Sequence, residues 1–348
     1  MATLLLGGAD AAAQASKPGG REVVLARAAR KLEAPPRLVL ALYYPWYGLP
    51  KVSGQARHVG KIDSSARRSP EFAHTPQAGL YDSTDPAAVT RHFKQLKSAG
   101  VDAIACSWWG PKDFTGTAIR KLLPLAQREG LRVCLYVEQL PQGTTPAAAL
   151  QWLADELEVL AKSPAYLKVE DRPVLFLYER AVRQLDPEQW AGVLEGLNRA
   201  VPPGVLAVAD GDGLSEAMVF DGTHRNNPAP ALAGVPPAEW KTRWEGVLRP
   251  AAERAHQWDR IAVATVSPGY DESRLVRNGA VIGRNSGDFY RRGWEAALAL
   301  RPDWVLVRSF NQWHDGTEIE PSVEHGDLYL KLTSEYAARF RAQSGRAR

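Results

Sequence analysis

Near its carboxyl end the chain reads Trp304-Val305-Leu306-Val307-Arg308-Ser309-Phe310-Asn311-Gln312-Trp313-His314-Asp315-Gly316-Thr317-Glu318-Ile319-Glu320-Pro321. Its first four residues form an apolar run that is typical of a buried β-strand. The residues that follow carry two amides, an indole, an imidazole and three carboxylates, and such charges are costly to bury without partners. Aromatic faces hold sugar rings and carboxylates transfer protons, so the stretch predicts an active site just past a strand. The alternative is a solvated loop between a strand and a helix.

Apolar runs of strand length recur along the chain, with helical patterns between most of them. The other predicted strands are 38–44, 101–107, 131–138, 173–178, 205–209, 218–220 and 261–266. Asp85-Pro86 predicts the start of a helix that ends near Gly100, because this pair suits an N-cap and a first turn. The remaining predicted helices are 147–160, 187–197, 237–255 and 288–300.

Strands that alternate with helices imply parallel strands joined by right-handed crossovers. Eight of them predict a single (β/α)8 barrel, a TIM barrel with extended βα loops. The alternative is an open doubly wound sheet. Such a sheet usually has a glycine-rich phosphate loop after its first strand, and Tyr-Tyr-Pro-Trp-Tyr occupies that place here.

The barrel predicts where functional groups gather, because active sites lie at the carboxyl ends of barrel strands. Aromatic and acidic side chains are frequent at these ends: Tyr44, Trp46, Ser107, Trp108, Trp109, Glu138, Tyr178, Glu179, Asp210, Asp212, Asp221, His224, Tyr270, Asp271 and the residues from Asn311 to Glu320. The mixture favours a carbohydrate ligand, whose C–H faces stack on rings while carboxylates accept from hydroxyls. For any single aromatic the alternative is packing at the rim.

Four blocks of the chain, in the same order and spacing, resemble glycoside hydrolase family 99, the endo-α-mannosidase and endo-α-mannanase family. The family signature Asn-Glu-Trp-His-Glu-Gly-Thr-Gln-Ile-Glu is similar to residues 311–320. The other blocks are Tyr43-Tyr44-Pro45-Trp46-Tyr47-Gly48; Asp85-Pro86 through His92 and Gly100-Val101-Asp102-Ala103 to Ser107-Trp108-Trp109; and Ser267-Pro268-Gly269-Tyr270-Asp271 with Arg274, Arg284, Asn285 and Tyr290. The resemblance covers about residues 36–322 and implies a barrel that hydrolyses an α-linked glycan.

The resemblance also implies which residues contact the sugar. The expected substrate-binding residues are Tyr44, Trp46, Tyr47, Trp108, Trp109, Tyr178, His224, Tyr270, Arg284, Asn285, Asn311, Trp313 and His314. Glu138 stands at an acidic position of the family's sugar site, and a carboxylate that closes a buried strand needs a partner or a task. Arg284 and Asn285 could instead be structural, through an ion pair with Asp271. For Glu179, next to Arg180, a salt bridge at the rim is the simpler interpretation.

Both catalytic glutamates of the family are replaced in this chain, by Gln312 and Asp315. The family mechanism uses one glutamate to deprotonate the sugar's 2-hydroxyl, which displaces the leaving group and forms a 1,2-anhydro sugar. Asp315 stands at the general acid/base position, and its side chain is shorter by one methylene, about 1.5 Å, where rate depends steeply on placement. Gln312 stands at the base position, and an amide accepts no proton near neutral pH. The second catalytic group would then be Glu138, Glu318 or Glu320.

Three accounts of function remain open from the sequence. The first is a diverged family-99-like glycoside hydrolase acting on an α-mannoside-like glycan, with Asp315 as general acid/base. The second is a catalytically weak or inactive carbohydrate-binding protein on the same scaffold. The third is a glycosyltransferase-associated carbohydrate-active domain, which would need a basic or phosphate-binding site for a donor nucleotide. The first is favoured, although fold resemblance alone does not fix function.

Composition is that of a globular protein, with 348 residues, 45% hydrophobic residues, 24% charged residues and a net charge of +4. We expect an oligosaccharide or polysaccharide partner, no nucleic acid, no membrane span, no cofactor, and a monomer. The histidines show no metal-ligand spacing, so no metal site is predicted. Cys106 and Cys134 each lie in a predicted strand and are expected to be buried thiols, not a disulfide.

The amino-terminal segment resembles the end of a signal peptide. The apolar run Thr3-Leu4-Leu5-Leu6 precedes the small residues Ala11-Ala12-Ala13-Gln14-Ala15, although Asp10 interrupts and no basic region comes first. We therefore expect a leader or linker over 1–34, the barrel over 35–343 and a basic tail over 344–348. A secreted or periplasmic location is favoured over a cytoplasmic one.

Overall fold

Eight parallel strands close into a barrel in the described part of the chain, residues 20–32, 35–60 and 69–344 of the computed structural model. The barrel strands are β1 (Leu38–Tyr43), β2 (Ala103–Trp108), β3 (Arg132–Val137), β5 (Arg172–Leu177), β6 (Leu206–Asp210), β7 (Gly222–His224), β8 (Ile261–Val266) and β11 (Trp304–Val307). Pairing of β3 with β5, in the register Leu135 to Leu175, closes the ring. The predicted (β/α)8 barrel is confirmed.

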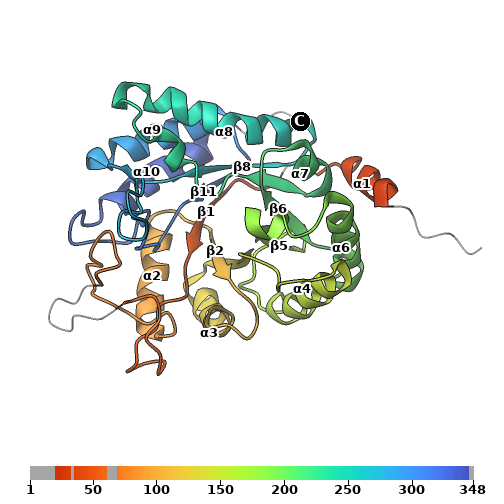
Figure 1. The fold of residues 1–348 in the computed structure, drawn as a ribbon, viewed down its shortest axis with the longest axis horizontal. Coiled ribbons are helices and arrows are strands. Elements are labelled where there is room, and N and C mark those ends of the chain that lie inside the picture. Colours follow the sequence, from red (N-terminus) through yellow and green to blue (C-terminus); the bar gives the residue numbers. More distant parts are fainter. Residues whose placement is uncertain (1–19, 33–34, 61–68, 345–348) are drawn as a thin grey trace, which may run out of the picture.

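Helices surround the barrel (Figure 1). They are α2 (Pro86–Ser98), α3 (Phe114–Glu129), α4 (Pro146–Leu160), α5 (Glu179–Val182), α6 (Pro187–Ala200), α7 (Leu214–Val219), α8 (Trp240–Gln257), α9 (Asp288–Ala299) and α10 (Leu328–Ala342). The predicted cap of α2 is present, because the Asp85 carboxylate accepts from the amide of Ala87. A capping box at Asp186 and Gln189 fixes the start of α6 in the same way.

One predicted strand is wrong. The run 218–220 belongs to the end of α7 and the residue after it, and the sixth barrel strand is β7 instead. A short apolar run does not separate a buried strand from a buried helix, and Ala217 and Val219 are apolar because α7 packs on the barrel. Short strands outside the barrel are β4 (Lys168–Val169), antiparallel to β5, and the hairpin of β9 (Tyr270–Asp271) and β10 (Val281–Ile282).

The folded part of the chain begins before residue 35. A helix, α1 (Gly20–Ala28), packs beside α6 and α7 within the segment expected to be a leader (Figure 1). Its Arg27 is buried, donates to the Val219 carbonyl, and pairs with Glu195 at 3.0 Å and Asp221 at 3.3 Å. This helix therefore belongs to the barrel domain, while the signal-like residues before it, and nearly all of the expected tail, lie outside the described residues.

The barrel interior and the layer between strands and helices form one apolar core. Cys106 and Cys134 are buried free thiols, as expected. Among the helices that the structure describes, none combines the length and the apolar composition needed to cross a bilayer. The polar side chains of interest lie beyond the carboxyl ends of the strands, where the loops are long enough to build a site.

Candidate active site

A buried arginine joins Asp315 to Tyr44. Arg308 directly follows β11, and its guanidinium donates to the Tyr44 hydroxyl at 2.6 Å and to Asp315 Oδ2 at 2.7 Å. The second oxygen of Asp315 accepts from the Thr317 hydroxyl at 2.7 Å. All three partners are buried, so the ion pair lies in a medium where it is stronger than on a surface.

Glu138 follows β3 and is also influenced by the charge of Arg308. Its Oε1 accepts from the Ser107 hydroxyl at 2.7 Å, and Ser107 in turn accepts from the Trp109 indole at 3.1 Å. Arg180 reaches Glu138 Oε2 at 3.5 Å and lies over the rings of Trp109 and Tyr178. Glu138, Trp109 and Tyr178 therefore share one part of the barrel mouth.

Both carboxyl groups lie within electrostatic reach of Arg308. Arg308 interacts electrostatically with both Asp315 and Glu138, and the Tyr44 hydroxyl interacts with both as well. Burial raises the pKa of Asp315 and of Glu138, while the charge of Arg308 opposes this rise in each. Two carboxyl groups of raised pKa at the mouth of a barrel are a suitable pair for proton transfer.

Gln312 and His314 lie beside this pair. The Gln312 amide oxygen is 3.3 Å from His314 Nδ1, and both side chains are buried. Burial lowers the pKa of His314 to about 4, and nearby His58 adds to the effect. The imidazole is therefore neutral at physiological pH. His58 stacks on the half-buried ring of Trp46, with ring centroids 4.3 Å apart. The centroids of the Trp46 and Tyr44 rings are 4.7 Å apart. The Trp46 ring is therefore packed among other aromatic rings and remains partly exposed.

Three predicted sugar-binding residues hold the loop in place instead. Asn311 accepts from the Tyr44 amide at 2.7 Å, and the Tyr47 hydroxyl donates to the Asn311 carbonyl at 2.7 Å. The Trp313 indole donates to the Tyr81 hydroxyl at 3.1 Å. Asn311, Tyr47 and Trp313 are all fully or almost fully buried, so they position their neighbours rather than line an open surface.

Glu318 and Glu320 are buried within separate polar networks. Glu318 is 0% exposed and contacts Arg284 at 2.5 Å and His74 at 2.8 Å. Glu320 accepts from the Tyr81 hydroxyl at 2.8 Å and contacts His92 at 3.1 Å. Both carboxylates are thereby engaged by other side chains, although no described side chain hydrogen-bonds Glu318 Oε2. Glu138 stays a candidate for the second group, because its Oε2 has a long contact with Arg180, at 3.5 Å.

Two further predicted residues belong to the core. Trp108 is 0% exposed and packs on Trp152 of α4, with ring centroids 4.2 Å apart, so its indole lies in the core and not at an open surface. Side chains alternate along a strand, and Ser107 rather than Trp108 points toward Glu138. His224 is also 0% exposed; it contacts the Tyr136 hydroxyl at 3.1 Å and the Ala209 carbonyl at 2.9 Å.

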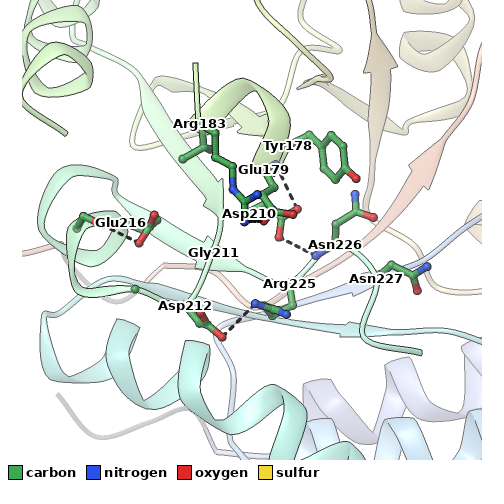
Figure 2. A pocket seen from close by; sticks show the side chains of 13 residues that line it. Tyr178, Glu179, Arg183, Asp210, Gly211, Asp212, Glu216, Arg225, Asn226 and Asn227 are labelled. Carbon is green, nitrogen blue, oxygen red and sulfur yellow. Dashed lines mark hydrogen bonds and ion pairs between the residues drawn. The ribbon is translucent and has the colours of Figure 1, made fainter. Parts of the chain in front are cut away.

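A polar cavity of about 460 Å³ lies beyond β5, β6 and β7 (Figure 2). Tyr178 borders both this cavity and the space near Arg308. Asp210 is held by the backbone amides of Glu179 and Asn226, and Arg225 pairs with Asp212 at 3.1 Å. Glu179 pairs with Arg183, not with Arg180 as the sequence suggests. Carboxylates, amides and an aromatic ring around such a volume suit the hydroxyls of a sugar.

A second cavity, of about 340 Å³, lies beside the loop that carries Asp315. Tyr270, Arg284 and the exposed Asn285 line it, together with Gly316. The Tyr270 hydroxyl donates to Glu272 at 2.5 Å, and the amide of Asp271 donates to the Asp315 carbonyl at 2.8 Å. Arg284 pairs with Glu318, so the alternative ion pair with Asp271 is wrong. In the described ranges no group of histidine, cysteine and acidic side chains is arranged to hold a metal ion.

Sequence reasoning missed Arg308, the residue at the centre of the site. A charged side chain between the buried strand Trp304–Val307 and a buried Ser309 was a usable signal, because such a charge needs a partner. Thr317 and Ser107 were missed as hydrogen-bond donors to the two carboxyl groups. Their roles depend on which side chains meet across loops, which spacing alone does not give.

Comparison with known proteins shows the family of the chain. The family model for glycosyl hydrolase family 99 matches residues 36–227 and 230–339. The chain belongs to this family. It is 26% identical to the mouse (Mus musculus) glycoprotein endo-alpha-1,2-mannosidase over 388 residues, covering 94% of this chain and 81% of the mouse protein. It is 24% identical to the human (Homo sapiens) glycoprotein endo-alpha-1,2-mannosidase-like protein, covering 86% and 75%.

A solved structure shares the fold. The family 99 endo-alpha-mannosidase from Bacteroides thetaiotaomicron superposes with a TM-score of 0.71 at 24% identity, over 87% of this chain and 97% of that chain. The resemblance seen in the four sequence blocks is thus confirmed, and this family 99 member is a glycoside hydrolase with a glycan substrate.

Proposed function

We propose that this chain hydrolyses an internal α-linkage in a mannose-containing glycan, with Asp315 and Glu138 as the two groups that exchange protons with substrate. The mouse relative named above is a glycoprotein endo-alpha-1,2-mannosidase and the human one an endo-alpha-1,2-mannosidase-like protein, which supports both the sugar and the internal cut. The observation that carries the proposal is that two buried carboxyl groups follow β3 and β11, one in direct contact with Arg308 and the other within its electrostatic reach. A pair of carboxyl groups across a scissile bond is what most glycoside hydrolysis requires.

The surroundings of the pair support a glycan of several sugar units. Trp46, Trp109 and Tyr178 are half-buried aromatics around the carboxyl groups, and rings of this kind stack on sugar faces. The cavity in Figure 2 extends the polar surface away from the carboxyl groups past Tyr178. A substrate that continues on one side of the cut would find hydrogen-bond partners there, as an endo-acting enzyme needs.

Gln312 takes part as a hydrogen-bonding group, not as a base. Its amide oxygen faces His314, which is neutral, and an amide gains no proton near pH 7. The family's 2-hydroxyl mechanism therefore lacks its base at this position, and Glu138 is our candidate to replace it, because its Oε2 has a long contact with Arg180. Asp315 acts as general acid/base in this account.

A reducing-sugar assay over a panel of α-linked mannans and glucans tests the proposal. Wild type should cleave an α-mannan, and Asp315→Asn should lower the rate by about 10²- to 10⁴-fold, the usual worth of a general acid or base. One observation favours a second candidate, a glycan-binding protein: both oxygens of Asp315 are already occupied by donors. Absence of turnover on every member of the panel, with glycan binding by calorimetry, would support that candidate instead.

A further inference from the structure

Arg308 is held at both ends of its guanidinium group. Nη1 donates to the Tyr44 hydroxyl at 2.6 Å, and Nη2 donates to Asp315 Oδ2 at 2.7 Å. Arg308 directly follows β11 and Tyr44 directly follows β1, and these two strands are neighbours in the barrel, with Ala41 opposite Val307. Both side chains are buried. The guanidinium is therefore anchored to the barrel wall by a residue from the neighbouring strand.

The backbone around Asp315 is fixed as well. The amide of Asp271 donates to the Asp315 carbonyl at 2.8 Å. Gly316 has a φ of +60°, and a Cβ at this position would lie 3.1 Å from Ala73 Cβ and 3.2 Å from Asp271 Cβ. The Thr317 hydroxyl donates to Asp315 Oδ1 at 2.7 Å. Because an aspartate side chain is short, a fixed backbone and a donor on each carboxyl oxygen hold the group in one orientation.

Holding the carboxyl group does not block it. A carboxylate has about four lone-pair positions, and Arg308 and Thr317 each occupy a position on a different oxygen. Each oxygen therefore keeps a position for a proton or for a hydrogen bond from substrate or water. Burial raises the pKa of Asp315, whereas the charge of Arg308 opposes this rise. The contact with Arg308 thus stabilises the charged form without excluding the protonated form that a general acid needs.

We infer that Arg308 and Tyr44 form a clamp that positions the carboxyl group of Asp315 for proton transfer. The inference rests on the proposed function, in which Asp315 is the general acid/base. Both members of the clamp are positioning residues: Arg308 acts through Asp315, and Tyr44, which the sequence predicts as a sugar contact, acts through Arg308. An aspartate reaches about 1.5 Å less far than a glutamate would, so its proton tolerates little displacement, and a misplacement of about 1 Å can cost about 10²-fold in rate.

Two substrates separate this role from a merely structural one. An alcohol leaves the sugar with a proton from a general acid, whereas fluoride leaves without one. Arg308→Gln should lower kcat/KM on an α-mannan by about 10²-fold, mainly through kcat, and should lose far less on an α-mannobiosyl fluoride. Asp315→Asn should show the same split. An arginine that merely supports the fold would lower both values together, and that result, or a mannan rate equal to wild type, would overturn the inference.

Three further variants test the path from Tyr44 to Asp315. Arg308→Gln added to Asp315→Asn should cost little more than Asp315→Asn alone, because the group that Arg308 positions is already gone; a full further loss would contradict the inference. Tyr44→Phe removes one oxygen and should give a smaller loss with the same split, and it replaces Arg308→Gln if that protein fails to fold. Arg308→Lys supplies a point charge that cannot bridge both partners and should recover part of the rate, whereas full recovery would show that charge suffices and overturn the clamp.

Failure of the proposed function would look different from failure of the clamp. Wild type that cleaves neither substrate, or an Asp315→Asn protein as active as wild type on the mannan, would overturn the proposed function itself. Wild type and Asp315→Asn proteins that behave as proposed, beside an Arg308→Gln protein with equal losses on both substrates, would overturn the clamp alone.

Discussion

Replacing Arg284 by methionine should destabilise the fold strongly, because the buried Glu318 carboxylate would lose its ion-pair partner. Glu318 is 0% exposed, and the Arg284 guanidinium contacts it at 2.5 Å, donates to the Gly316 carbonyl at 3.0 Å and lies 4.5 Å from the Tyr329 ring centroid. Removing one partner of a buried ion pair costs about 3 to 5 kcal/mol, since the other charge is left uncompensated. His74 remains near Glu318, so the lower end of that range is expected.

Urea unfolding followed by tryptophan fluorescence measures this cost. The matched control is Glu318→Gln, which removes the charge and keeps the shape, and it should cost less than Arg284→Met. The double variant should lose clearly less free energy of unfolding than the two single variants together, because no buried charge is then left without a partner. An Arg284→Met protein within about 0.5 kcal/mol of wild type, the range of an ordinary surface change, would refute the structural role of this pair. So would a Glu318→Gln protein of unchanged stability that has lost its kcat, which would make Glu318 catalytic.

Three other changes probe the site. Gln312→Glu should raise the hydrolysis rate on simple α-mannosides by about 10²- to 10⁴-fold if only the family base is missing. The same variant should lower the rate on the natural glycan. Equal rates of variant and wild type would place position 312 outside the chemistry. Glu138→Gln should raise the melting temperature at pH 7, because burial raises the pKa of Glu138 in the folded state and so penalises its ionised form above that pKa. This rise in melting temperature should shrink as the pH falls toward the pKa of a glutamate in the unfolded chain. A rise that grows at acid pH would contradict the prediction. Asp212→Ala should raise KM for long glycans by about five- to tenfold, which corresponds to the loss of one hydrogen bond of roughly 1 to 1.4 kcal/mol. The KM for the short substrate α-mannobiosyl fluoride should not change. An equal effect on both substrates would exclude the cavity in Figure 2 from glycan binding.

The fold follows closely from sequence pattern, and its exceptions have physical reasons. Apolar runs bounded by caps such as Asp85-Pro86 predict the barrel, because local periodicity and capping agree with the global fold. The run 218–220 is the exception, since a short apolar segment is equally compatible with a helix. The placement of α1 on α6 and α7 depends on tertiary contacts of Arg27, which no local pattern contains.

The sequence predicts which face of the barrel carries the site, but not which side chains pair with one another there. Strand ends predict that Glu138 and Asp315 lie at the same face of the barrel, because all parallel strands end there. Strand alternation could have separated Ser107 from Trp108, as the side chains of neighbouring residues point to opposite faces. The pairing of Arg308 with Asp315, and of Arg284 with Glu318, depends on side-chain directions in loops that spacing does not determine.

Product analysis of a defined α-1,2-linked mannose oligosaccharide tests the central claim most directly. Chromatography with mass spectrometry, applied to wild type and Asp315→Asn after the same incubation, identifies which bond is cut. The account predicts that wild type releases an oligosaccharide by one internal cut, and that the Asp315→Asn variant, folded as judged by its melting temperature, releases about 10²- to 10⁴-fold less. Release of single mannose units, or equal product from both proteins, would contradict it.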